Sequence, residues 1–307
     1  LALDNDAGRA ILVQNISYVT LFFLGLVMIT SRRRLYLLAL TMLIAGLLQA
    51  IYGIMGYLSG DAFGLWRPGY LGHQSATGTF VNRNHFAANV SMAICINLGL
   101  LLASRRLTEP GTGPRAMLRQ LLRNALSPRA ILYLTLAIML AALILSQSRG
   151  ANLALFIAVI TVIILGAVRH GHRAKVLGLI PLIIILSIGA VFTFGSADMP
   201  ERFSRIMQEG GDRMLVWKQS LLLMQDRELV GIGGGGYEWQ FPQHKTASIA
   251  LNHYDHPHND YIEMLVEYGI IGSLLWAMAV LVIWLAILKA YRRRHDPLMH
   301  GLAYAGL

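Results

Sequence analysis

The stretch HPHNDYIEMLVEYGIIGSLLWAMAVLVIWLAIL, residues 256–288, joins a polar cluster to a long apolar run. A bilayer core of roughly 30 Å is crossed by about 20 apolar residues of helix, and this run is longer than that. Pro257 holds the residue before it extended. Asn259 or Asp260 is suited to cap the helix, and Asp260 with Glu263 has the spacing of a capping box. The stretch therefore predicts a membrane span that is entered from a polar surface.

The composition of the whole chain points to an integral membrane protein. Of its 307 residues, 55% are hydrophobic and 14% are charged, and the mean hydropathy is +0.54, which is too apolar for a soluble domain. We expect an all-α, polytopic bundle of transmembrane helices that forms a single membrane domain over residues 1–307 and is part of a longer protein. Seven stretches are long enough to cross a bilayer, at about 11–30, 35–58, 84–103, 130–147, 151–168, 176–195 and 261–288, and an eighth begins near residue 298.

Basic residues collect on one predicted side of the membrane. The loops after the first, third, fifth and seventh stretches have a net charge of +14, whereas the rest of the chain has −4. By the positive-inside rule, the basic side is cytoplasmic. The formal net charge of +10 is therefore explained by membrane topology, and nucleic acid is not expected as a partner.

One long connection, residues 196–260, lies on the opposite side and exceeds the length of an ordinary loop. Its aromatic residues and a helix-like stretch at 212–227 argue against disorder. Val216 and Leu223 spoil strict amphipathicity, so this helix is covered on two sides or lies in the membrane interface. Four apolar residues at helical spacing define its predicted apolar face: Met214, Trp217, Leu221 and Met224.

His258 stands just before the last complete span, where the positive end of the helix dipole disfavours imidazolium. A neutral ring can accept a proton, so His258 is a candidate general base, with a surface loop histidine as the alternative. Imidazole and carboxylate groups alternate around it in a way that resembles a metal site, but the spacing is poor for zinc. No metal and no cofactor are therefore expected. The alternating residues are His253, Asp255, His256, His258 and Asp260.

Two arginines on the non-cytoplasmic side are candidates for binding an anion. Arg149 lies in a turn of three residues between two uncharged spans, and a charge at a membrane boundary often marks function. The alternative is an arginine that reaches lipid head groups. Arg213 begins the helix of the long loop, where a cation is mildly unfavourable against the dipole. Its alternative is an ion pair with Asp212 or Glu209.

Other polar positions gave weaker predictions. The four glycines at 233–236 could let backbone N–H groups approach a phosphate, but a turn or a close helix contact is the preferred interpretation. Asn82 and Asn84 are suited to cap the span that starts near residue 84. Glu263 and Glu267 share a helix face and are interpreted as structural.

Taken together, four stretches resemble the O-antigen ligase and polymerase superfamily of bacterial membrane glycosyltransferases. The resemblance covers roughly residues 78–288, in matching order and topological placement. Departures are that the family usually has more spans and commonly has other residues where this chain has four glycines. The stretches are GTFVNRNHFAANV at 78–90, SQSRGA at 146–151, DRMLVWKQSLLLMQDRELVGIGGGGY at 212–237 and HPHNDYIEMLVEYGIIG at 256–272.

The resemblance implies a fold like that of GT-C-type membrane glycosyltransferases, with functional residues at Arg149, Arg213 and His258. It implies transfer of a glycan from a polyprenyl-diphosphate carrier to an acceptor hydroxyl, without a metal, at the outer face of the bacterial cytoplasmic membrane. The partners would be this donor, a glycan or lipid-linked acceptor and the lipid bilayer. Additional candidates for sugar or phosphate contacts are Arg83, Asn84, Asn259 and Tyr261.

Several alternatives remain open at this point. The resemblance does not separate a ligase that acts in lipopolysaccharide, capsule or exopolysaccharide assembly from a polymerase or a protein O-oligosaccharyltransferase. A transporter or channel for a small anion would use the arginines as a funnel, but the first six spans hold essentially no mid-membrane charge. A flippase for the lipid-linked glycan would share the substrate.

Overall fold

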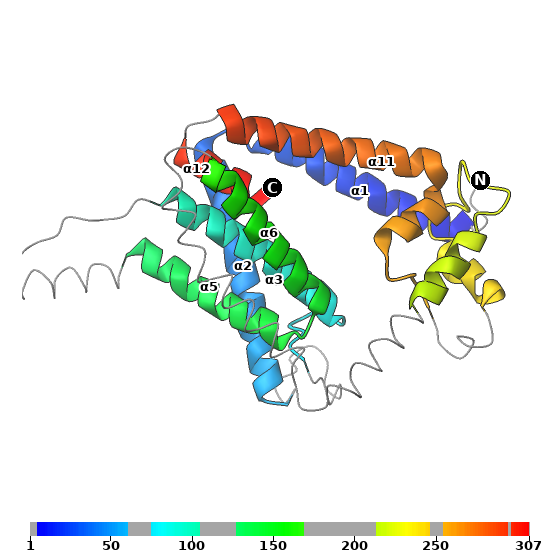
Figure 1. The fold of residues 1–307 in the computed structure, drawn as a ribbon, viewed down its shortest axis with the longest axis horizontal. Helices are drawn as coiled ribbons and strands as arrows, with labels where there is room; N and C mark the ends of the chain where they lie inside the picture. The colour runs from blue at the N-terminus through cyan, green and yellow to red at the C-terminus, as the bar shows by residue number, and fades with distance from the viewer. Residues whose placement is uncertain are drawn as a thin grey trace, which may run out of the picture. The chain divides into compact units, whose positions relative to one another are not determined.

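The computed structural model describes residues 5–60, 75–104, 127–168, 213–245, 254–293 and 296–306. Within these ranges all regular structure is helical and there is no strand (Figure 1). The contacts divide the chain into two compact units. Unit 1 comprises Leu1–Thr30 and Ala197–Ile283, and unit 2 comprises Ser31–Ser196 and Trp284–Leu307.

The helices confirm the predicted all-α, polytopic architecture. Five of those in the described ranges are long and apolar enough to cross a membrane, and a sixth, α6, is apolar over Arg149–Thr161. The predicted stretch at 176–195 lies outside the described residues. The long helices are α1 (Asn5–Met28), α2 (Arg32–Leu58), α3 (Arg83–Ala103), α5 (Pro128–Leu145), α6 (Arg149–Val168), α11 (Asp260–Arg293) and α12 (Pro297–Gly306). Together they make the chain a multi-pass helical membrane protein.

Local sequence signals fix where the helices of unit 2 begin. The side chain of Ser31 accepts a hydrogen bond from the backbone N–H of Arg34 at 3.3 Å and caps α2. Ser127 caps α5 in the same way, and Pro128 occupies the first helical position, where its missing N–H costs nothing. The predicted spans therefore start close to residues that can satisfy the otherwise unpaired N–H groups of a helix.

The core of unit 2 lies among α2, α3, α5, α6 and α12. Asn97 of α3 donates to Thr135 Oγ1 of α5 at 2.7 Å and to the carbonyl oxygen of Leu132 at 3.1 Å. The backbones of α3 and α12 approach closely where Gly99 meets Gly301, because a Cβ at either glycine would overlap the carbonyl oxygen of the other. Small residues and buried side-chain amides commonly join helices inside a membrane.

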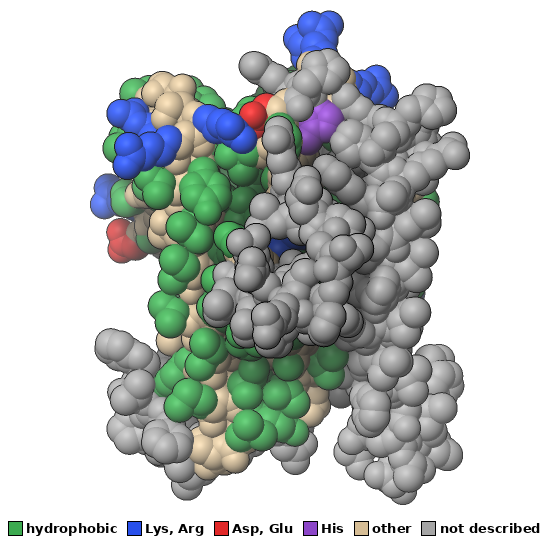
Figure 2. Space-filling view, turned by 90° about the vertical axis from the view of Figure 1, so that its left-hand side faces the viewer, with side chains coloured by type: hydrophobic (Ala, Val, Ile, Leu, Met, Phe, Trp, Pro, Cys, Tyr) green, Lys and Arg blue, Asp and Glu red, His purple; other side chains and the backbone are tan. Residues whose placement is uncertain are grey.

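Many large apolar side chains lie on the exposed surface of the helices as well as in the core. Phe23 of α1 and Leu134 of α5 are both more than half exposed, at 59% and 63%. In the face drawn in Figure 2, hydrophobic side chains cover the described helices, and Lys and Arg side chains gather at one end. Since a continuous apolar surface of this kind is unstable in water, it indicates contact with lipid tails.

We predict that Gly99→Ala destabilises unit 2 by about 1–3 kcal/mol, the cost of overpacking a tight core, because the new methyl group overlaps the carbonyl oxygen of Gly301. Thermal unfolding in detergent should show a lower Tm. Gly25→Ala is the matched control, because the nearest atom to its added Cβ is 3.9 Å away and alanine is the better helix former. An equal or higher Tm for Gly99→Ala would contradict the close approach of the two backbones.

Candidate functional site

The start of α11 is capped by Asn259 rather than Asp260. The Asn259 Oδ1 atom accepts from the backbone N–H groups of Tyr261 at 3.1 Å and Ile262 at 3.3 Å. Glu263 does not complete the predicted capping box: its carboxylate lies 2.7 Å from Nδ1 of His256. The capping-box prediction is therefore wrong, because His256, four residues ahead of the helix, offers the carboxylate a hydrogen-bond partner.

His258 precedes the capping residue and has a left-handed backbone, with φ of 53°. This conformation is uncommon outside glycine, although His, Asn and Asp adopt it more readily than other residues. Its neighbours hold it there: Trp217 donates its indole N–H to the carbonyl oxygen of Pro257 at 3.0 Å. The Tyr254 ring meets the His258 ring edge to face at 6.4 Å between centroids. The imidazole is thus exposed on one side and packed on the other.

The surroundings of His258 lower the pKa of its imidazole below the usual value of 6.5. Partial burial has the largest effect, followed by the positive charges of Arg213 and His256, while Asp255 and Glu263 act in the opposite direction. A lowered pKa favours the neutral ring, in the direction that the sequence predicts. The causes differ from the expected one, because desolvation and Arg213, rather than the helix dipole, account for the shift.

Arg213 stands on the helix of the long loop, which spans residues 213–222 in the described part. The buried side of this helix is only partly the predicted one. Met224 of the predicted face is buried together with Val216, Ser220 and Leu223, whereas Met214 and Leu221 are 55% and 43% exposed. The reason is that Ser220 finds a polar partner inside: its hydroxyl lies 2.8 Å from the hydroxyl of Tyr237, itself fully buried.

A break at Gly269 divides α11 into a short first part next to the candidate site and a longer second part. Gly269 has φ of 65° and ψ of −172°, which is not helical. Tyr261 and Trp276 would be about 22 Å apart along a straight helix, yet their rings meet at 6.3 Å between centroids. The predicted span is therefore interrupted at Gly269. Residues 270–293 alone are longer than the roughly 20 residues needed to cross a bilayer. The helical turns before Gly269 belong to the candidate site.

The segment 228–233 satisfies the backbone groups that the break frees. In an unbroken helix the N–H groups of Ile270 and Ile271 would bond to the carbonyl oxygens of Val266 and Glu267. Here these two N–H groups donate to the carbonyl oxygens of Glu228 and Leu229, at 2.9 and 3.2 Å. The two released carbonyl oxygens accept from the N–H groups of Ile232 and Gly233, at 3.0 and 2.9 Å. We call these four hydrogen bonds the backbone clasp.

The glycine run closes the clasp and does not present a free row of N–H groups to a ligand. Gly231 has φ of 71°, and an added Cβ would lie 2.6 Å from the backbone nitrogen of Gly269. The buried carboxylate of Glu267 accepts from the backbone N–H of Tyr237 at 3.3 Å. The interpretation of the run as a turn in close helix contact is confirmed, and so is the structural role of Glu267.

In unit 2, a hydrogen bond joins the starts of α3 and α6. Ser148 donates its hydroxyl to Oδ1 of Asn84 at 2.9 Å. Asn82, rather than Asn84, caps α3 by accepting from the backbone N–H of Asn84 at 2.8 Å. Arg83 and Arg149 are both exposed, each one residue from the bonded pair. Two helix N-termini and two guanidinium groups at one end of unit 2 are suited to bind an anion.

The structure therefore brings the candidate residues together in two sets. Arg213, His258, Asn259 and Tyr261 belong to unit 1, whereas Arg83, Asn84 and Arg149 belong to unit 2. Sequence reasoning missed Tyr254, Trp217 and the clasp. A signal for the clasp was present in the glycines at positions 231 and 269, which lie at positive φ. Within the described ranges, no three His, Cys, Asp or Glu side chains are grouped to hold a metal ion.

Comparison with known protein families gives a match, which includes the motifs at 146–151, 212–237 and 256–272 but not the one at 78–90. Residues 134–277, just under half of the chain, match the model of the family described as "O-Antigen ligase". The match confirms the resemblance stated above and indicates a role in the assembly of O-antigen or a related polysaccharide. It includes Arg149, Arg213 and His258 but not Arg83 or Asn84. Neither the curated proteins nor the solved structures compared with the chain gave a match.

We predict that Arg213→Gln raises the pKa of His258 and Asp255→Asn lowers it further, because these two charges act in opposite directions on the imidazole. The measurement is the rate of diethyl pyrocarbonate modification of His258 against pH, followed by peptide mass spectrometry. The neutral ring reacts, so the midpoint of the profile reports the pKa directly. A midpoint that does not move in either variant would show that neither charge acts on the ring.

We also predict that Gly269→Ala opens the clasp, since alanine is strained at its positive φ and an added Cβ would lie 2.5 Å from the backbone of Leu229. Hydrogen exchange at the amides of Ile232 and Gly233 should become faster. Gly234→Ala is the control, because its added Cβ meets the flexible end of the Tyr268 side chain at 3.0 Å. Equal protection in both variants would mean that the clasp does not depend on Gly269.

Proposed function

We propose that the protein is a glycosyltransferase that moves a glycan from a polyprenyl-diphosphate carrier to an acceptor hydroxyl during surface polysaccharide assembly. The observation that carries the proposal is the imidazole of His258, held by Trp217 and Tyr254 and with a pKa lowered by burial and by the charge of Arg213, within the stretch that matches the O-antigen ligase family. A base beside a fixed cation is the pairing that acceptor activation and loss of an anionic leaving group require.

The reaction is a displacement at the anomeric carbon. The acceptor oxygen forms a bond to this carbon while the bond from carbon to the diphosphate oxygen breaks, and the electron pair of the broken bond stays on the diphosphate. The hydroxyl proton passes to the imidazole of His258. Because one nucleophile displaces the leaving group directly, the anomeric configuration inverts, which NMR of the new linkage would show.

Guanidinium groups stabilise the diphosphate as its negative charge grows. Arg213 is proposed to do so because its positive charge helps lower the pKa of His258. Charge-assisted hydrogen bonds from a guanidinium to phosphate are strong. Arg149 is proposed for the same role on the basis of the family motif and its place at the start of α6. Asn84, Arg83, Asn259 and Tyr261 are proposed to contact sugar or phosphate groups, and no metal is needed for the reaction.

Membrane orientation follows from the distribution of charge. The arginine-rich loops are proposed to face the cytoplasm, which puts residues 196–260 and the start of α11 on the periplasmic or exterior side of the cytoplasmic membrane. The broken helix does not favour the alternative of an ion transporter. Transporters use such breaks to bind ions through freed backbone groups, whereas here those groups bond to residues 228–233.

The test is release of polyprenyl diphosphate from a labelled lipid-linked glycan by the full-length protein, with membrane acceptors and EDTA present. His258→Ala should lose about 10²–10⁴-fold in rate, the usual contribution of a general base. Arg213→Ala and Arg149→Ala should lose about 10²–10³-fold, as for removal of one group that stabilises a developing anion.

Each matched control removes an imidazole or a positive charge at a position outside the proposed site. The controls are His244→Ala, Lys218→Ala and Arg129→Ala, all at exposed or half-exposed positions. These should retain the rate of the wild type. Failure of the wild-type protein to release the carrier from varied donors would overturn the function. Release that survives all three site variants would overturn the site and leave the function standing, and loss of release with EDTA would overturn metal independence.

A further inference from the structure

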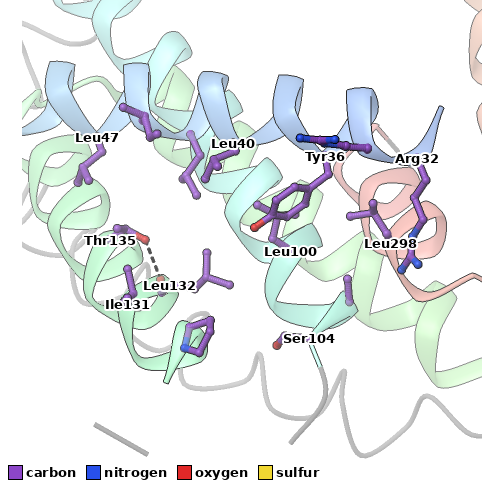
Figure 3. Close-up of a pocket in the computed structure, with 15 residues that line it drawn as sticks. Arg32, Tyr36, Leu40, Leu47, Leu100, Ser104, Ile131, Leu132, Thr135 and Leu298 are labelled. Carbon is purple, nitrogen blue, oxygen red and sulfur yellow. Dashed lines mark hydrogen bonds between the residues drawn. The ribbon is translucent and has the colours of Figure 1, made fainter. Parts of the chain in front are cut away.

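A cavity of about 890 Å³ opens within unit 2. Its walls come from α2, α3, α5 and α12, and its lining is mostly leucine and isoleucine (Figure 3). None of the residues assigned to glycan transfer lines it. A cavity of this size is within the range of small-molecule sites. The residues that line it indicate the class of ligand that it binds.

The cavity has its charged residues at one end, and the rest of its lining is mostly apolar, with Tyr36 and Thr135 as the uncharged polar residues there. Arg32, Arg33 and Ser104 lie at the end where α2 begins and α3 stops. Leu40 and Leu47 follow along α2, and Figure 3 shows them on the side away from Arg32. A ligand that fills it therefore has an anionic head and a hydrocarbon tail.

The charge at the polar end is positive. Among the described residues that line the cavity there are two arginines and no carboxylate. Arg32 is partly neutralised, because its Nε lies 3.3 Å from Oδ2 of Asp296, which also caps α12. Arg33 adds a second guanidinium to the lining, and its side chain is exposed. One phosphate fits this arrangement, since a guanidinium can bind it with two hydrogen bonds.

The length of the cavity corresponds to one lipid leaflet. From Arg32 to Leu47 the rise of α2 is about 22 Å. Half of a bilayer, head groups included, is also about 20–22 Å. The ligand thus has its head group at the membrane surface and its chain in the core, as a phospholipid has.

We propose that this cavity binds an anionic glycerophospholipid, with its phosphate at Arg33 and one acyl chain along Leu40 and Leu47. Tyr36 also lines the cavity, and Figure 3 shows its hydroxyl pointing away from Arg32 toward the middle of the cavity. The lipid belongs to the leaflet on the arginine-rich side of the membrane. The site is separate from glycan transfer, so its test reads binding and not activity.

The experiment is native mass spectrometry of the full-length protein in detergent, titrated with phosphatidylglycerol, phosphatidylcholine or undecaprenyl phosphate. Phosphatidylglycerol should bind most tightly. Arg33→Gln should weaken its binding about fivefold, the effect of one basic residue at a membrane surface. Arg34→Gln is the matched control: it removes an adjacent exposed arginine that does not line the cavity, and the affinity should remain that of the wild type.

A second pair of variants tests the tail. Leu40→Trp fills the cavity and should abolish retention of the lipid, whereas Leu37→Trp lies on the exposed side of α2 and should not. Equal affinity for phosphatidylcholine, equal effects of the two arginine variants, or lipid retained by Leu40→Trp would overturn the proposal. Tighter binding of undecaprenyl phosphate would also overturn it, by giving the cavity to the polyprenyl carrier.

Discussion

The backbone clasp is the constraint on which the rest of unit 1 depends. A helix cannot break next to a membrane without leaving N–H and C=O groups unpaired, and each such group is costly away from water. Gly269 breaks α11, and the segment 228–233 replaces two lost helical hydrogen bonds with four from outside the helix. The cost of the break is thereby offset, and the start of α11 can turn away from the direction of its span.

The break gives the site its geometry. The capping residue and His258 lie ahead of Gly269, and the hydrogen bond from Trp217 to Pro257 ties this segment to the loop helix that bears Arg213. Trp217 and Tyr254 then hold the imidazole from two sides. A histidine on a mobile loop would keep an ordinary pKa, whereas this one is packed closely enough for burial and a neighbouring guanidinium to favour its neutral form.

Much of the architecture was predictable because lipid imposes one simple rule on sequence. Apolar stretches of sufficient length become spans, and the starts of α2, α3, α5 and α12 fall within a few residues of the expected positions. The packing of the loop helix was not predictable in the same way. Met214 and Leu221 are exposed, while the Ser220 hydroxyl is buried because Tyr237 meets it. Helical periodicity alone does not distinguish these two cases.

The indole of Trp217 allows the site to be followed by fluorescence during the reaction. Its N–H bonds to the carbonyl oxygen of Pro257 across 40 residues of sequence, directly beside the candidate base. Indole emission is sensitive to hydrogen bonding and to water, so in a variant whose other four tryptophans are replaced by phenylalanine the emission wavelength of Trp217 reports whether the loop that carries His258 stays docked. Such a variant carries an optical probe beside the candidate base, and no external label is needed to follow the loop while substrate binds.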